Sequence, residues 1–101
     1  MKKPLKIKNL SIGERSKTFV IAEIGINHDG NFEKCKRLIK AASNCGADAA
    51  KIQLVNVHES YDKKTISFKE FKDKNFSDDQ LRDLKKYADK NYAHPNVNIM
   101  L

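Results

Sequence analysis

Two apolar runs with a helix between them constrain the fold of this chain more than any other feature. The first run spans residues 18–26 and the second spans residues 49–55. Strands that are apolar on both faces are typical of a parallel sheet covered by helices. Between them, residues 31–45 carry apolar side chains at the i, i+3 and i+7 spacing of an amphipathic helix. The order strand, helix, strand predicts a βαβ crossover in an α/β fold.

Weaker patterns lie on either side of this unit. Residues 1–17 are basic, and their alternating apolar residues predict a hairpin that leads into the first strand. Residues 56–75 form a long polar loop, in which residues 66–71 predict a helical turn. The chain is therefore divided into an N-terminal lead-in, residues 1–17, and a partial α/β domain, residues 18–101.

A second helix begins with a specific sequence signal. Ser77 and Gln80 have the spacing of a capping box, in which each side chain bonds the backbone amide of the other residue. Apolar residues at helical spacing continue toward Lys90, and Pro95 prevents the helix from extending further. The closing residues 97–101 are mainly apolar and predict the start of a third strand.

Composition and charge narrow the classes of protein to consider. No apolar run approaches the ~20 residues of a membrane span, and no apolar segment follows the first lysines as in a secretory signal. The formal net charge of +7 is compatible with nucleic acid or anionic metabolites. Zinc-finger spacing, an RNP-type aromatic motif and a basic recognition helix are all missing, so nucleic-acid binding is the weaker prediction.

The two cysteines, Cys35 and Cys45, both fall in the first predicted helix. A rise of about 1.5 Å per residue separates them by ~15 Å along the helix axis. A disulfide needs Cα atoms within about 7 Å, so no bridge can join them. We expect two free thiols that face the core, as is typical of a protein in the reducing cytoplasm.

Three polar side chains interrupt the two apolar strands. Alternation places Glu23 on one face of the first strand, and Lys51 and Gln53 together on one face of the second. An unpaired buried charge costs several kcal/mol, so these groups need partners. One interpretation is a structural Glu23–Lys51 ion pair with Gln53 bonded nearby. The other is a ligand site, since α/β proteins bind ligands at the carboxyl ends of parallel strands.

A ligand site of this composition suits an anionic, polyhydroxyl substrate. Glu23 can act as a base or accept a hydroxyl hydrogen bond, and Lys51 can bind an anion. The amide of Gln53 can recognise a sugar hydroxyl. Asn27 and His28 follow the first strand directly, although a lone histidine in a loop is more often a solvated or hydrogen-bonded residue than a catalyst.

Two further histidines, His58 and His94, have no partners at metal-ligand spacing, and we expect both on the surface. The sequence also contains no nucleophile elbow, phosphate-binding P-loop or GxGxxG fingerprint. The polar groups of the two strands therefore remain the main candidates for chemistry.

The strand motifs resemble a known family. Residues 19–30 are Phe-Val-Ile-Ala-Glu-Ile-Gly-Ile-Asn-His-Asp-Gly, and residues 49–53 are Ala-Ala-Lys-Ile-Gln. Together they are similar to the N-terminus of N-acetylneuraminate (sialic acid) synthases and of the related pseudaminic and legionaminic acid synthases. The resemblance covers about residues 5–55 and extends more loosely over residues 77–90.

This resemblance implies the first βα units of a (β/α)8 TIM barrel. It implies condensation of phosphoenolpyruvate with an N-acetylated amino sugar, such as N-acetylmannosamine, with release of phosphate. It also implies a homodimer and a divalent cation, manganese or magnesium, whose histidine ligands come from later strands. By position, Glu23 resembles an active-site carboxylate near the sugar and the metal. Lys51 resembles a lysine that contacts phosphoenolpyruvate, Gln53 a sugar-contacting amide, and Asn27 a residue of the substrate-binding loop.

A complete barrel of this kind needs about 250 residues. We therefore expect a truncated or split piece of such a synthase, inactive alone, with exposed strand edges and helix faces. Two alternatives stay open. The chain could be a non-catalytic piece that completes a barrel with another polypeptide, or a small basic α/β module that binds nucleic acid.

Overall fold

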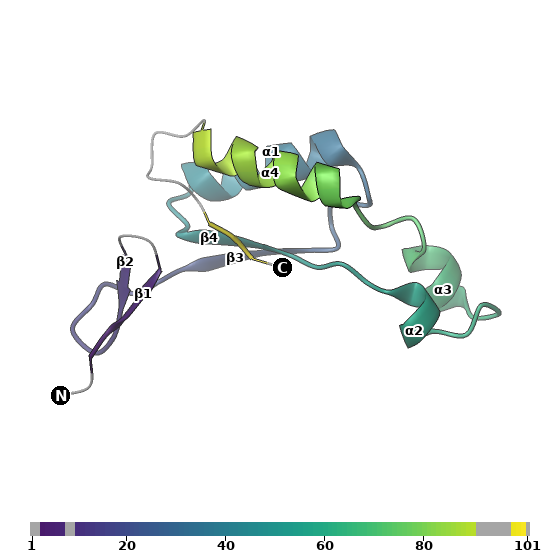
Figure 1. Cartoon of the computed structure of the whole chain (residues 1–101), viewed down its shortest axis with the longest axis horizontal. Helices are drawn as coiled ribbons and strands as arrows, with labels where there is room; N and C mark the ends of the chain where they lie inside the picture. Colours follow the sequence, from purple (N-terminus) through teal and green to yellow (C-terminus); the bar gives the residue numbers. More distant parts are fainter. Residues whose placement is uncertain (1–2, 8–9, 91–97, 101) are drawn as a thin grey trace.

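The computed structural model describes residues 3–7, 10–90 and 98–100 (Figure 1). Nine helices and strands lie in this described range. Their order is β1 (Leu5–Ile7), β2 (Leu10–Ile12), β3 (Ile21–Gly25), α1 (Phe32–Asn44), β4 (Ala49–Ile52), α2 (Val57–Ser60), α3 (Ile66–Phe71), α4 (Asp78–Lys90) and β5 (Asn98–Met100). None of the described helices is long and apolar enough to cross a membrane.

The main sheet has three parallel strands in the order β3-β4-β5. Helix α1 connects β3 to β4, so the predicted βαβ unit is confirmed. Helices α1 and α4 contact each other and lie together over one face of the sheet (Figure 1). This arrangement leaves the opposite face of β3 and β4 without a covering helix in the described part of the chain.

The core lies between the sheet and these two helices. Its fully or nearly fully buried residues come from β3, α1, β4, α4 and the segment before α4: Ile24, Cys35, Ile39, Ala42, Ala50, Ile52, Phe76, Leu84 and Ala88. On the other side of the sheet, Ile21 remains 45% exposed. The prediction that the strands are buried on both faces is therefore wrong for Ile21, because helices cover only the other face of the sheet.

Strands β3 and β4 are both shorter than predicted. Before β3, the Val20 amide donates to the Asp48 carboxylate at 2.8 Å, so a side chain takes the place of a strand partner. After β4, the Val55 N–H donates to the Asn75 Oδ1 atom at 3.0 Å, and the Asn75 Nδ2 atom donates to the Val55 carbonyl at 2.8 Å. At these two positions, side chains pair with backbone groups that the strand ladder does not reach.

The helices predicted over residues 31–45 and from Ser77 toward Lys90 are confirmed as α1 and α4. The Asn31 side chain caps α1 by accepting from the Lys34 amide at 2.9 Å, and Gly46 follows the helix with a φ of +83°. At the start of α4, the Ser77 N–H donates to Gln80 Oε1 at 2.9 Å and the Gln80 N–H donates to Ser77 Oγ at 3.2 Å. These two bonds are the predicted capping box.

The two cysteines are free, as predicted, but they differ in exposure. Cys35 is fully buried in the core, and its burial raises the pKa of the thiol to about 11. Cys45 is exposed, so its predicted place in the core is wrong. The physical reason is its position as the C-cap of α1, where the chain leaves the helix for the turn at Gly46.

The peripheral segments match the sequence only in part. Strands β1 and β2 pair antiparallel, which confirms the predicted hairpin. The long loop contains the predicted helix α3 and also α2, a short helix that the sequence did not indicate. Strand β5 confirms the central part of the predicted third strand. The predicted stop at Pro95, the surface position of His94 and the two ends of that third strand lie outside the described residues.

Candidate active site

Glu23 and Lys51 lie side by side on the sheet face opposite the helices. The strand register pairs Glu23 of β3 with Lys51 of β4. Successive side chains in a strand point to opposite faces. The neighbouring residues Ala22, Ile24 and Ala50 contact the core beneath the helices. Alternation therefore places the two charged side chains on the other face of the sheet. Figure 1 shows that α1 and α4 do not cover this face.

The predicted ion pair forms, with 3.3 Å between Glu23 Oε2 and Lys51 Nζ. About half of each side chain is exposed, 54% for Glu23 and 48% for Lys51. An ion pair with this exposure contributes only about 0–1 kcal/mol to stability. Structural stability alone thus gives little reason for two charges within apolar strands. Because both groups stay accessible, an anionic or hydroxyl-bearing ligand can reach them.

Gln53 lies just beyond the end of β4, on the side of the strand that carries Lys51. Its side chain is exposed. Within the described residues it makes no hydrogen bond, so the predicted bond between the Gln53 amide and the ion pair is absent. The Gln53 backbone is held instead, since its N–H donates to the Gly25 carbonyl at 3.0 Å. The amide remains available to a ligand.

An irregularity in the strand pairing lies next to Glu23. The register pairs Glu23 with Lys51 but Gly25 with Ile52, so one extra residue is inserted into β3. Gly25 has a φ of +59°, which glycine adopts without steric cost. A Cβ atom at this position would lie 3.5 Å from Glu23 Oε1. Such bulges re-aim a neighbouring side chain, and the sequence pattern did not predict this one.

The loop after β3 is held by the two residues that follow the strand. The Asn27 Nδ2 atom donates to the Ile24 carbonyl at 2.8 Å, while the rest of the side chain is exposed. His28 is fully buried, so it is a hydrogen-bonded residue and not a solvated one. Its Nε2 atom lies 3.0 Å from the Gln53 carbonyl oxygen, and its Nδ1 atom accepts from the Gly30 amide at 2.9 Å.

The same loop docks onto the segment that precedes α4. Asp29 forms ion pairs with Lys34 and, at 3.7 Å, with Lys74. The hydrogen bond from Lys34, together with the charges of both lysines, lowers the pKa of the Asp29 carboxyl. Gly30 has a φ of +70°, and a Cβ atom there would lie only 2.0 Å from the Asp73 carbonyl oxygen. The geometry of the loop after β3 therefore depends on the segment that precedes α4.

A cavity of about 320 Å³ lies where β4 ends. It is lined by residues 54–58, together with Lys72, Asn75 and Phe76. Asn75 holds its wall in place through the two hydrogen bonds to Val55. Sequence analysis missed Asn75, because an asparagine within a polar loop gives no sign of a partner twenty residues away.

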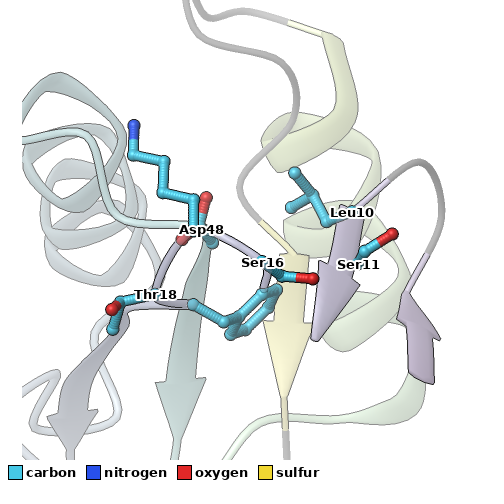
Figure 2. Close-up of a pocket in the computed structure, with 7 residues that line it drawn as sticks. Leu10, Ser11, Ser16, Thr18 and Asp48 are labelled. Atoms are coloured by element: carbon cyan, nitrogen blue, oxygen red, sulfur yellow. The ribbon is translucent and has the colours of Figure 1, made fainter. Parts of the chain in front are cut away.

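A smaller cavity lies at the other end of the sheet, beside the hairpin (Figure 2). It measures about 200 Å³, and Leu10, Ser11, Ser16, Thr18 and Asp48 contribute to its lining. Asp48 precedes β4, so this cavity opens at the amino ends of the strands. In (β/α)8 barrels that end supports stability and the carboxyl end carries the chemistry. The candidate site is therefore the one around Glu23 and Lys51.

The described residues do not form a metal site. No three histidine, cysteine, aspartate or glutamate side chains come close enough together in residues 3–7, 10–90 and 98–100 to hold an ion. Glu23 is paired with Lys51 and could supply one carboxylate at most. A divalent cation would need its other protein ligands from outside the described residues.

Comparison with known proteins gives consistent relatives, although no protein-family model matches the sequence. Human N-acetylneuraminate-9-phosphate synthase is 35% identical over 77% of this chain and 25% of its own length. An uncharacterized protein of Methanocaldococcus jannaschii is 38% identical over 85% of this chain and 26% of its own length. This chain thus spans about a quarter of the length of these curated relatives.

A solved structure shows the same arrangement of elements. The crystal structure of N-acetylneuraminic acid (sialic acid) synthetase from Leptospira borgpetersenii, in complex with citrate, matches with a TM-score of 0.85 at 26% identity. The match covers 97% of this chain and 33% of that chain. The resemblance detected in the strand motifs is confirmed by these comparisons.

Proposed function

This chain belongs to the N-acetylneuraminate (sialic acid) synthase family, as the first βα units of its (β/α)8 barrel, and we propose that it forms one wall of a condensation site. The substrates would be phosphoenolpyruvate and an N-acetylated amino sugar. The observation that carries this proposal is the Glu23–Lys51 pair, 3.3 Å apart and half exposed on the open face of the sheet.

The two charged groups suit the two substrates. The Lys51 ammonium is a compact cation that can bind the phosphate or carboxylate of phosphoenolpyruvate. The Glu23 carboxylate can accept a hydrogen bond from a sugar hydroxyl or take up a proton. The exposed Gln53 amide, one step beyond β4, can both donate to and accept from further hydroxyls. Asn27 lies in the loop beside them and would complete the sugar side of the wall.

The proposed reaction joins carbon 3 of phosphoenolpyruvate to the aldehyde carbon of the open-chain sugar. Water adds at carbon 2, and the bond between that carbon and the phosphate oxygen breaks to release phosphate. The aldehyde oxygen takes up a proton and becomes a hydroxyl. Electrostatic stabilisation of the anionic groups by Lys51 would be the main contribution of this wall.

The remaining walls must come from further strands. A (β/α)8 barrel needs about 250 residues, so 101 residues cannot close one. We call the chain together with the polypeptide that supplies those strands the assembled barrel. We expect it to be a cytoplasmic homodimer that uses a divalent cation, with the two free thiols fitting a reducing compartment.

Replacement of Lys51 tests this function. In the assembled barrel, Lys51→Ala should raise the KM for phosphoenolpyruvate and lower kcat/KM by about 100-fold, because one positioned charge on the anion is lost. Phosphate release measured against phosphoenolpyruvate concentration gives both constants. For practical assembly, residues 1–101 can replace the matching third of the Leptospira enzyme.

Lys40→Ala is the matched control, since Lys40 is an exposed lysine on α1. It removes the same charge away from the open sheet face and should leave kcat/KM within about twofold, as surface substitutions usually do little. An unchanged KM for phosphoenolpyruvate in the Lys51→Ala protein would contradict the role of this lysine. A wild-type assembled barrel that releases no phosphate would contradict the proposed function itself.

A further inference from the structure

His28 connects the loop that follows β3 with the segment that follows β4. The side chain is fully buried and its ring packs against Phe76, with 4.6 Å between ring centroids. Since Nδ1 accepts from the Gly30 amide, the ring proton of the neutral imidazole is assigned to Nε2. Nε2–H then donates to the Gln53 carbonyl. Both ring nitrogens are occupied, so His28 is not placed to exchange protons with a substrate.

The backbone at Gln53 depends on the hydrogen bond from His28 more than the backbone at Lys51 does. Lys51 is held on both sides, by its pairing with Glu23 in β3 and with Met100 in β5. Gln53 lies beyond the end of β4, where the described pairing with β5 has already stopped. Its N–H bonds to Gly25, and its carbonyl oxygen receives the bond from His28. Loss of the imidazole would leave the Gln53–Leu54 peptide group without the bond to its carbonyl, while the preceding Ile52–Gln53 peptide group stays bonded to Gly25.

We propose that His28 is a positioning residue for the sugar side of the site, acting through Gln53. This inference rests on the condensation function proposed above. His28 fixes the Gln53–Leu54 peptide group through its carbonyl, while the Gly25 carbonyl holds the preceding Ile52–Gln53 peptide group. Together these two bonds set the direction in which the exposed Gln53 side chain leaves the backbone. Lys51 is anchored by strand pairing and does not need His28. Loss of His28 should therefore weaken binding of the amino sugar and leave binding of phosphoenolpyruvate nearly unchanged.

The test compares three variants in the assembled barrel. His28→Phe keeps a ring against Phe76 but removes both hydrogen bonds. His28→Gln restores a donor for the Gln53 carbonyl. Ile39→Ala truncates a fully buried residue of α1 and serves as the control for lost stability. Activity is measured at a temperature at which the wild type and all three variants are folded, with the concentration of each substrate varied in turn.

We expect His28→Phe to raise the KM for the amino sugar about 10–100-fold, as expected for a displaced binding group, while the KM for phosphoenolpyruvate changes by less than about threefold. His28→Gln should recover most of the loss. Ile39→Ala should change neither KM appreciably. Equal changes in both KM values, or a His28→Phe protein that behaves like Ile39→Ala, would overturn the positioning role.

A second measurement does not depend on catalysis. Hydrogen exchange of the Gln53 backbone N–H should be at least about 10-fold faster in His28→Phe than in Ile39→Ala, because one of the two peptide groups that flank Gln53 has lost its hydrogen bond and this segment opens more readily. Unchanged exchange in an active enzyme would overturn the role of His28 and leave the proposed function intact. A wild-type assembled barrel without condensation activity would instead overturn the proposed function, so the two failures are distinguishable.

Discussion

Gly30 occupies the tightest point of the loop that carries Asn27 and His28. A Cβ atom at Gly30 would lie 2.0 Å from the Asp73 carbonyl oxygen, and the φ of +70° disfavours any other residue. Gly30→Ala should therefore lower the free energy of unfolding of the assembled barrel by about 3 kcal/mol, from backbone strain and steric overlap together. Urea titration measures this loss.

Gly46 provides the matched control for this prediction. Its φ is +83°, but a Cβ atom there would have no atom within 4 Å. Gly46→Ala should cost only the backbone strain, about 1 kcal/mol. Equal losses for the two variants would show that the contact between Gly30 and Asp73 does not constrain the loop.

Alternation along the strands predicted the positions of Glu23 and Lys51, because a period of two depends only on the local sequence. The ion pair between them followed from that placement and is observed. The burial of His28 could not be predicted in this way. It depends on Phe76, which lies far along the chain, and on the Gln53 carbonyl, whose position follows from a bulge that the sequence pattern does not reveal.

Among the elements, helices were predicted more closely than strands. The capping box of Ser77 and Gln80 is a local signal, and it predicted where α4 begins. Strand ends depend on non-local partners. The apolar pattern continued to Val55, but the Asn75 side chain takes over the backbone bonds there and ends β4 earlier.

The contact between Asn75 and Val55 gives a prediction for this segment. Asn75→Ala removes both partners of the Val55 backbone in a partly buried place, so unfolding free energy should fall by about 2 kcal/mol. Asn56→Ala, which removes the exposed cap of the short helix α2, should cost less than about 1 kcal/mol. Urea titration compares the two proteins, and hydrogen exchange of the Val55 amide should quicken only in Asn75→Ala. If Asn75→Ala lowered the unfolding free energy no more than Asn56→Ala does, the proposed role of Asn75 in holding the Val55 backbone would be contradicted.

On the scale of the whole molecule, the sheet has one covered face and one open face. Val20, directly before β3, is 49% exposed, and Ile21, the first residue of β3, is 45% exposed. Val20 also lines a mainly apolar cavity of about 360 Å³ between β3 and α1, to which the site residues Glu23 and Asn27 contribute as well. In a closed barrel the edge of β3 pairs with another strand and its groove is filled by neighbouring elements. The surroundings of Val20 should therefore differ between the chain and the assembled barrel.

Val20→Lys makes this difference measurable. In the 101-residue chain the side chain is half exposed, so the substitution should change the free energy of unfolding by less than about 0.5 kcal/mol. In the assembled barrel it would bury an unpaired ammonium and cost at least about 2 kcal/mol. Leu84→Ala is the control, because Leu84 is fully buried within the chain itself and should cost about 2–5 kcal/mol in both forms. If Val20→Lys cost the same in both forms, the open edge of β3 would not be the surface on which the barrel closes.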